Sequence, residues 1–189
     1  IKTGKSRLQA DWLLEMDTYY DATWRFYSSY GLRVNQWATG MPIGIKEPDD
    51  DEMTDELLAE IEALVNEAEK AIYSGRYAEK IDRTSFIDWY LVHEVAYNGE
   101  PNHPKSCYFY FRDGIMYAGP VWDFDWNTFQ PGKSGLFISQ SIYFGELLKD
   151  SSCVSALKAR WAVLKPTFQT VASYIDEKAD EIRDSEAVN

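Results

Sequence analysis

The fold is indicated most clearly by residues 106–126, which read SCYFYFRDGIMYAGPVWDFDW. The aromatic run at residues 106–112 is typical of a β-strand. Asp113-Gly114 is a strong signal for a two-residue hairpin turn, so we expect residues 115–117 to form the return strand. Gly119-Pro120 should interrupt that strand. The stretch therefore predicts an antiparallel hairpin that leads into a short segment rich in acids and tryptophan.

Two further strands are expected upstream of the hairpin. Residues 11–17 are short and apolar and can form a core strand, although the pattern alone leaves helix or strand open. Residues 41–46 alternate weakly and are predicted to form an edge strand, where Pro42 is tolerated. Residues 18–40 are aromatic and interrupted by glycine, and their pattern assigns no element.

Helices are expected to occupy most of the remaining chain. Thr54 can cap a helix that Gly75 ends, and Asp82 can cap a second one. The four acids at residues 49–52 lack the ligand pattern of an EF-hand and should lead into the first helix. The apolar stripes of these two helices recur at spacings of three and four: Leu57, Leu58, Ile61, Leu64, Val65, Ala68, Ala71 and Ile72, then Phe86, Ile87, Tyr90, Leu91 and Val95.

The C-terminal part is predicted to contain two more helices. The first should begin at Ser151 or Ser152 and the last at Pro166, because proline is tolerated in a first helical turn. The core face of the last helix is expected to include Phe168, Val171, Ile175 and Ile182. We predict an α+β fold with a small antiparallel sheet and surrounding helices, organised as a single domain over residues 1–189.

Composition excludes several classes of function. The 189 residues carry a net charge of −12, which argues against binding to nucleic acid or to an anionic membrane. There is no apolar stretch of about 18 residues, so no membrane span is predicted. Aromatic residues make up 15% of the chain, which favours either a large aromatic core or a surface that stacks on sugars or bases. Cys107 and Cys153 are expected to be buried free thiols, although one bridge between them is possible.

The segment Trp122–Trp126 is the strongest candidate for chemistry. Buried acids are costly unless they are paired or bind a cation. If the segment is extended, Asp123 and Asp125 point to one face and the apolar residues to the other. Two converging carboxylates suit Mg²⁺ or Mn²⁺, which prefer oxygen ligands. The alternative is that the two acids pair with arginine or cap a loop.

The segment Gly119–Asp125 resembles the signature of the CotH kinase family, the spore-coat-protein-H-like atypical kinases. Further landmarks occur in the family's order: residues 1–7 with 13–17, residues 42–49, and residues 98–108. The resemblance implies a protein-kinase-like fold of which this chain holds the C-terminal portion, without the N-terminal part that grips the nucleotide. Accordingly, Gly4-Lys5-Ser6 is interpreted as a turn, and the chain alone is expected to bind nucleotide poorly.

The resemblance also implies roles for individual residues. Asp123 would hold Mg²⁺ or Mn²⁺ with ATP, assisted by Asp125, and Ser106 would occupy a second metal-ligand position. Glu100 would occupy the position of the catalytic base. The candidate nucleotide contacts are Tyr117, which could stack on adenine, and Lys105, which could contact phosphate; a core tyrosine and a solvated lysine are the alternatives.

Three functional hypotheses follow. The first is Mg²⁺-dependent phosphoryl transfer from ATP to a serine or threonine of a protein substrate, in an exported or cell-surface bacterial protein. The second is an inactive pseudokinase or interaction module of an exported multidomain protein; it is favoured because Glu100 and Ser106 stand where the family pattern has Asp and often Asn. The third, independent of the resemblance, is carbohydrate binding or hydrolysis, since aromatic residues with paired acids suit glycosidases.

Overall fold

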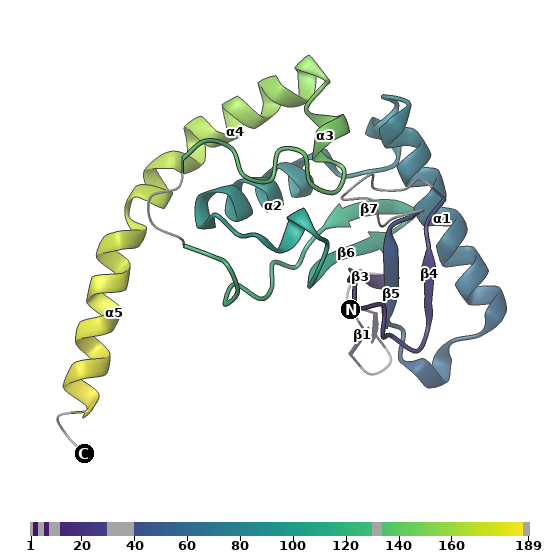
Figure 1. Cartoon of the computed structure of the whole chain (residues 1–189), viewed down its shortest axis with the longest axis horizontal. Helices are drawn as coiled ribbons and strands as arrows, with labels where there is room; N and C mark the ends of the chain where they lie inside the picture. Colours follow the sequence, from purple (N-terminus) through teal and green to yellow (C-terminus); the bar gives the residue numbers. More distant parts are fainter. Residues whose placement is uncertain (1, 4–5, 8–11, 30–39, 130–133, 187–189) are drawn as a thin grey trace.

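The computed structural model describes residues 2–3, 6–7, 12–29, 40–129 and 134–186. These residues form an α+β fold built on a five-stranded antiparallel sheet with strand order β4-β5-β3-β6-β7 (Figure 1). A separate pair of two-residue strands, β1 and β2, lies at the N-terminal end. The strands are β1 (Lys2–Thr3), β2 (Ser6–Arg7), β3 (Trp12–Met16), β4 (Arg25–Tyr27), β5 (Pro42–Glu47), β6 (Cys107–Arg112) and β7 (Ile115–Ala118).

The predicted hairpin is confirmed by β6 and β7. Arg112 pairs with Ile115, so the connection is the two residues Asp113 and Gly114. Their φ angles are 51° and 72°. Positive φ at both central residues is what a hairpin turn compatible with strand twist requires, and Asp-Gly adopts it readily.

One strand prediction is wrong in its position. The strand predicted at residues 41–46 is found as β5, but it lies inside the sheet, between β4 and β3. The edge beside it is β4, within the stretch for which the pattern assigned no element. Pro42 is tolerated because it is the first residue of β5, where it lies opposite Tyr27 of β4.

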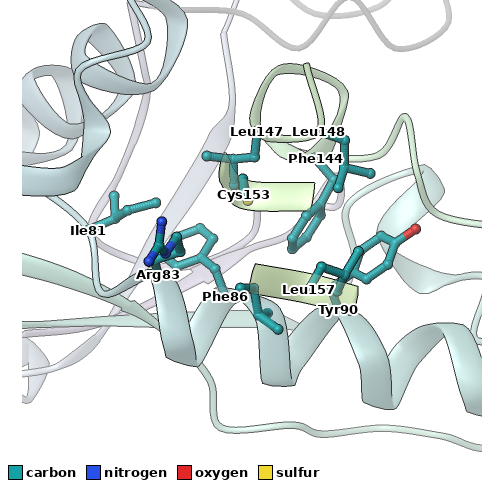
Figure 2. Close-up of a pocket in the computed structure, with 10 residues that line it drawn as sticks. Ile81, Arg83, Phe86, Tyr90, Phe144, Leu147, Leu148, Cys153 and Leu157 are labelled. Carbon is teal, nitrogen blue, oxygen red and sulfur yellow. The ribbon is translucent and has the colours of Figure 1, made fainter. Parts of the chain in front are cut away.

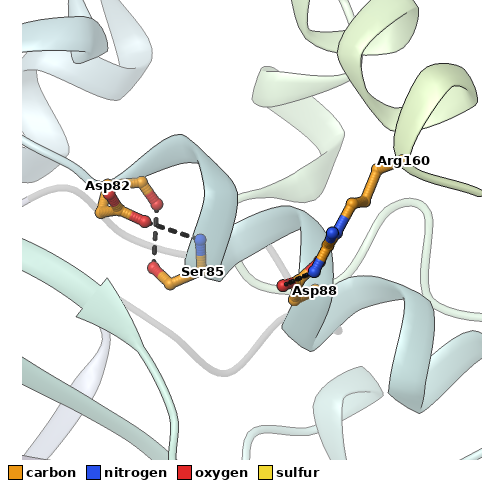
Figure 3. A network of polar contacts seen from close by, with 4 residues as sticks. All are labelled: Asp82, Ser85, Asp88 and Arg160. Carbon is orange, nitrogen blue, oxygen red and sulfur yellow. Dashed lines mark hydrogen bonds and ion pairs between the residues drawn. The ribbon is translucent and has the colours of Figure 1, made fainter. Parts of the chain in front are cut away.

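The two predicted N-caps are confirmed. In α1 (Asp55–Tyr73), the Thr54 Oγ1 accepts a hydrogen bond of 3.2 Å from the Leu57 N–H, and Gly75 follows the helix with a φ of 73°. In α2 (Arg83–Ala96), the Asp82 carboxylate accepts from the Ser85 N–H at 2.7 Å (Figure 3). Short 3₁₀ turns precede or follow these helices at Asp50–Glu52, Tyr77–Glu79 and Glu100–Asn102.

A bidentate ion pair joins α2 to α4 (Ser151–Gln169). Arg160 donates from Nε and from a terminal nitrogen to the two carboxylate oxygens of Asp88, at 2.7 and 2.8 Å (Figure 3). The short helix α3 (Phe144–Leu147) packs with the same part of the core. These contacts hold α3 and α4 against α2.

The core lies between one face of the sheet and the helices. Alternate residues of β6, namely Cys107, Phe109 and Phe111, are almost wholly buried, while the residues between them are half-buried. Cys107 and Cys153 are both buried free thiols, as predicted. A cavity of about 10 Å³ remains between α2, α3 and α4 (Figure 2), which holds one water at most.

The last helix departs from prediction. The helix α5 (Val171–Glu186) begins after Thr170, and Pro166 lies inside α4 instead of starting α5. In Figure 1, α5 runs away from the sheet. Its expected core residues Val171, Ile175 and Ile182 are therefore 42%, 58% and 60% exposed. No helix in the described part of the chain is long and apolar enough to cross a membrane.

Candidate functional site

Asn98 joins the two loops that build the site. The helix α2 ends at Ala96, and the φ of 53° at the next residue, Tyr97, turns the chain sharply into the loop that contains Asn98 and Glu100. The Asn98 Oδ1 accepts the Glu100 N–H at 2.9 Å, and its Nδ2 lies 3.5 Å from the carbonyl oxygen of Asp123, in the loop that follows β7. Asn98 is fully buried, so this side chain ties the loop after α2 to the loop after β7.

Ser106 and Asp123 are brought into direct contact. The Ser106 hydroxyl donates to Oδ2 of Asp123 over 3.2 Å. Both residues have left-handed backbone conformations, with φ of 51° and 56°. Such conformations are uncommon for residues other than glycine and often occur at functional sites.

The segment Trp122–Trp126 is an irregular loop, so the extended conformation assumed for it is wrong. The two acids nevertheless lie together, because the backbone turns at Asp123. A hydrogen bond with Asp123, followed by repulsion from its charge, raises the pKa of Asp125.

Glu100 is buried beside these acids, with a side chain that is 1% exposed. Burial raises its pKa to about 7, with Lys105 opposing the rise and the charges of Asp123, Asp17 and Asp125 adding to it. Neither carboxyl oxygen has a hydrogen-bond partner among the described residues. A group with a pKa near neutrality can both take up and release a proton at physiological pH.

Lys105 and Tyr117 occupy different surroundings. The Lys105 ammonium lies 4.8 Å from the centre of the Tyr19 ring, and a hydrogen bond with Tyr19 raises its pKa, with the charge of Glu100 adding to the rise. Tyr117 stacks on Tyr110 at 4.9 Å, and the Arg112 guanidinium lies 4.7 Å from the centre of its ring. The structure thus places Lys105 at the acidic site and Tyr117 in an aromatic cluster on the half-buried face of β6 and β7.

The acidic loop, residues 122–126, packs on aromatic side chains of α2. Phe124, between the two acids, stacks on His93 at 4.9 Å, and His93 in turn packs on Trp89 at 3.8 Å. His93 thus has a packing role: neither ring nitrogen has a hydrogen-bond partner among the described residues, and burial lowers its pKa to about 3.

The tryptophans on either side of this loop are accessible. Trp122 is 60% exposed and meets Tyr108 edge-on, while Trp126 is 46% exposed and meets His103 edge-on. The loop therefore presents its acids between two partly exposed indole rings.

Two residues of the site were not assigned a role from the sequence, Asn98 and Asp17. Asp17 follows β3 and reaches the site because the Thr18 N–H donates to the Pro104 carbonyl at 2.8 Å. No local signal identifies this contact, since the two residues are far apart in the chain. Asn98 could have been identified from the sequence, because it is a polar residue in the loop that follows α2.

The donor set suits a hard divalent cation that keeps other ligands. Asp123, Asp125 and Ser106 offer two carboxylates and a hydroxyl. Mg²⁺ is usually held by one or two carboxylates together with waters or phosphate oxygens. No cluster of three or more His, Cys, Asp or Glu side chains able to hold a metal occurs in the described residues, so a closed cage of protein ligands is not found there.

Comparison with known proteins places the chain in a family. No curated protein and no solved structure matches it. A family model described as "CotH kinase protein" matches residues 35–188, which include the loop of Glu100 and both acids of the Trp122–Trp126 segment. The resemblance noted at residues 1–17 lies upstream of this match and stays a prediction. Because the match spans well over half of the 189 residues, the chain belongs to the CotH kinase protein family.

Proposed function

We propose that this chain carries the metal-holding and base-bearing part of a phosphoryl-transfer site. In this proposal Asp123 and Asp125 hold Mg²⁺ or Mn²⁺ with the phosphates of ATP, and Glu100 receives the proton of an acceptor hydroxyl. The observation that carries it is the contact of Ser106 with Asp123, next to Asp125 and to the buried carboxyl of Glu100.

Each residue has a distinct task in this reaction. The cation, when bound, supplies positive charge to the transferring phosphoryl group. A hydrogen bond with Asp123 and repulsion from its charge raise the pKa of Asp125, and a bound cation would relieve that repulsion. Ser106 orients Oδ2 of Asp123, and Asn98 holds both loops at a constant separation. Preorganised positioning of this kind supplies most of the catalysis in phosphoryl transfer.

Glu100 suits a base because of its environment. A carboxyl whose pKa is raised to about 7 binds a proton more strongly than an ordinary glutamate, and it is still ionised in part at neutral pH. Lys105 lies close enough to oppose the rise, and it is the candidate contact for phosphate. A protein hydroxyl as acceptor, Tyr117 as an adenine contact and an exported bacterial setting belong to the same proposal and are supported by the family resemblance alone.

A second candidate function is a binding module without catalysis. It is favoured by the 1% exposure of Glu100, since a base must reach the acceptor hydroxyl, and by the Ser106 hydroxyl, which already donates to Asp123. In that case the acidic loop would still bind a cation or nucleotide, but no phosphoryl group would be transferred.

Calorimetric titration distinguishes both functions from a third possibility, that the chain has the family's fold but no metal and nucleotide site. Mg²⁺ alone, Mg-ATP and ATP with EDTA would be titrated into the chain and into Asp123→Ala, with the exposed Asp51→Ala as the matched control. We expect weak Mg-ATP binding that Asp123→Ala abolishes and Asp51→Ala keeps. Binding that is unchanged by Asp123→Ala would overturn the site.

Transfer of a labelled phosphoryl group to a hydroxyl acceptor then separates the two candidates. A kinase should lose transfer in Glu100→Gln while it still binds Mg-ATP. Binding without transfer in the unmodified chain would favour the binding module.

A further inference from the structure

Large apolar side chains are exposed along the loop that follows β7 and contains the acidic loop. Val121, Trp122, Trp126 and Phe129 are 45%, 60%, 46% and 69% exposed. Single exposed apolar residues are common on protein surfaces, but a group of them beside a functional site indicates a surface that binds a ligand. The two indole rings are the largest of these side chains, so a ligand of this surface should contact them first.

Another exposed aromatic ring lies at the same site. Tyr19, in the loop after β3, is 68% exposed, and the Lys105 ammonium lies 4.8 Å from the centre of its ring. The Thr18 N–H donates to the Pro104 carbonyl oxygen at 2.8 Å, which ties this loop to the residue before Lys105. Tyr19 therefore brings an aromatic surface from a distant part of the sequence to the loop of Glu100.

The three rings are all held by one short stretch of chain, residues 103–108. The Trp126 ring meets His103 edge-on with 4.9 Å between ring centres, and the Trp122 ring meets Tyr108 edge-on with 6.5 Å. The exposed tyrosine contacts the lysine that lies between these two positions. A stretch of this length spans at most roughly 18 Å even when fully extended. The rings therefore belong to one surface, short enough for a single oligomeric ligand to cover it.

Polar groups lie on the same loops as the three rings. They are the imidazole of His103, the ammonium of Lys105 and the exposed carboxylate of Asp125. The C–H groups of a sugar ring pack against an aromatic face, and the hydroxyl groups at its rim need hydrogen-bond donors and acceptors beside that face. Aromatic surfaces with a few polar groups between them are also the usual composition of a ligand site. The combination fits a carbohydrate chain.

The charges of the site make other ligands that stack on aromatic rings less suitable. The net charge of −12 disfavours a nucleic acid. A cationic peptide would be attracted by Asp17, Asp123 and Asp125, but it would meet the Lys105 ammonium, which already lies over the Tyr19 ring. It would also displace the divalent cation of the proposed function from the acidic loop. A neutral carbohydrate gains from the rings without either penalty.

We propose that Tyr19, Trp122 and Trp126 form a carbohydrate-binding surface, on which sugar rings of one chain stack beside the acidic loop. The polar side chains between the rings bind the hydroxyl groups of the sugars. This binding function goes beyond phosphoryl transfer and requires neither the cation nor ATP.

Calorimetric titration with oligosaccharides tests the proposal, in EDTA and without nucleotide. The probes are cellohexaose, xylohexaose, mannohexaose, chitohexaose and maltohexaose. We expect at least one of them to bind, and Trp122→Ala and Trp126→Ala each to raise its dissociation constant about tenfold or more, because tryptophans dominate the energetics of binding surfaces. Tyr19→Ala should also weaken binding.

A matched control and a conservative variant separate lost contacts from lost structure. Tyr174→Ala removes a ring that is 59% exposed on α5, which runs away from the sheet (Figure 1), and it should leave binding unchanged. Trp122→Phe keeps an aromatic face and should bind more tightly than Trp122→Ala. Far-UV circular dichroism would verify that each variant is folded.

Three outcomes would overturn the proposal. One is that none of the hexaoses binds, and another is that binding is unchanged in both Trp122→Ala and Trp126→Ala. The third is that hexalysine binds through these rings while no hexaose does, which would assign the surface to cationic peptides. Because the titrations contain EDTA and no ATP, their failure would leave the phosphoryl-transfer proposal standing, and failure of phosphoryl transfer would leave this surface standing.

Discussion

Replacing Glu100 by glutamine should make the protein more stable at neutral pH and change little in acid. The carboxyl is 1% exposed, has no hydrogen-bond partner among the described residues, and has a pKa of about 7 against an ordinary 4.5. Between these two pH values the folded protein holds a proton that the unfolded chain has released. The free energy of unfolding must therefore fall as pH rises from 4.5 to 7.

The size of the effect follows from the two pKa values. At about 1.4 kcal/mol per pKa unit, the difference between about 7 and 4.5 corresponds to about 3 kcal/mol of lost stability above pH 7. Glutamine resembles the protonated acid in shape and does not titrate, so Glu100→Gln removes this loss. A gain of about 3 kcal/mol would raise the melting temperature by roughly 6–12 °C in a domain of this size.

Urea unfolding of the parent protein and of Glu100→Gln from pH 4 to 8.5, with EDTA present, measures the difference in their free energies of unfolding directly. Glu60→Gln, at an exposed position of α1, controls for a change from glutamate to glutamine that involves no burial. The two curves should coincide near pH 4 and separate as pH rises to 7. A variant that is no more stable than the parent at pH 8 would refute the burial of an unpartnered carboxyl at this position.

Three further changes test the surroundings of the site. His93→Phe should keep the stack on Phe124 and make the protein more resistant to acid. The pKa of His93 is about 3 in the folded protein and 6.5 in the unfolded chain, so the free energy of unfolding falls as pH falls through that range. Acid unfolding monitored by circular dichroism measures this effect, and equal acid midpoints would contradict it. Gly99→Ala should destabilise by about 1–3 kcal/mol in urea unfolding, since its Cβ would lie 2.4 Å from the Asn127 Nδ2; an unchanged midpoint would mean that the two loops separate freely. A double-mutant cycle on Asp88→Ala and Arg160→Ala should give a coupling of about 0.5–1 kcal/mol, because the pair is bidentate but partly exposed, and a coupling of zero would show that it does not hold α4 to α2.

Local patterns predicted those elements whose signals lie within a few residues. The caps Thr54 and Asp82 each accept a hydrogen bond from a residue three positions away, and Asp113-Gly114 closes a turn between adjacent strand ends. The position of β5 inside the sheet was not predictable in the same way. It depends on β4, a three-residue strand that is too short to show an alternating pattern.

The C-terminal helices show a different limit of sequence patterns. Periodicity identified an apolar stripe in the last helix, and the stripe exists at Val171, Ile175 and Ile182. A stripe indicates that a helix has a face to bury, but it carries no information on which surface meets that face. Only the tertiary structure showed that α5 leaves the body after Thr170.

The sequence by itself determined the α+β class, the hairpin, the helix caps and membership of the family, because each is encoded in neighbouring residues or in an ordered motif. It also identified Glu100, Ser106, Asp123 and Asp125 as candidates. The tertiary structure alone decided how they meet. The Asn98–Asp123 and Ser106–Asp123 contacts span 25 and 17 positions, and the raised pKa of Glu100 depends on burial and on charges from three separate loops. Distances between loops and exclusion from water are properties of the packed chain, so no local pattern can report them.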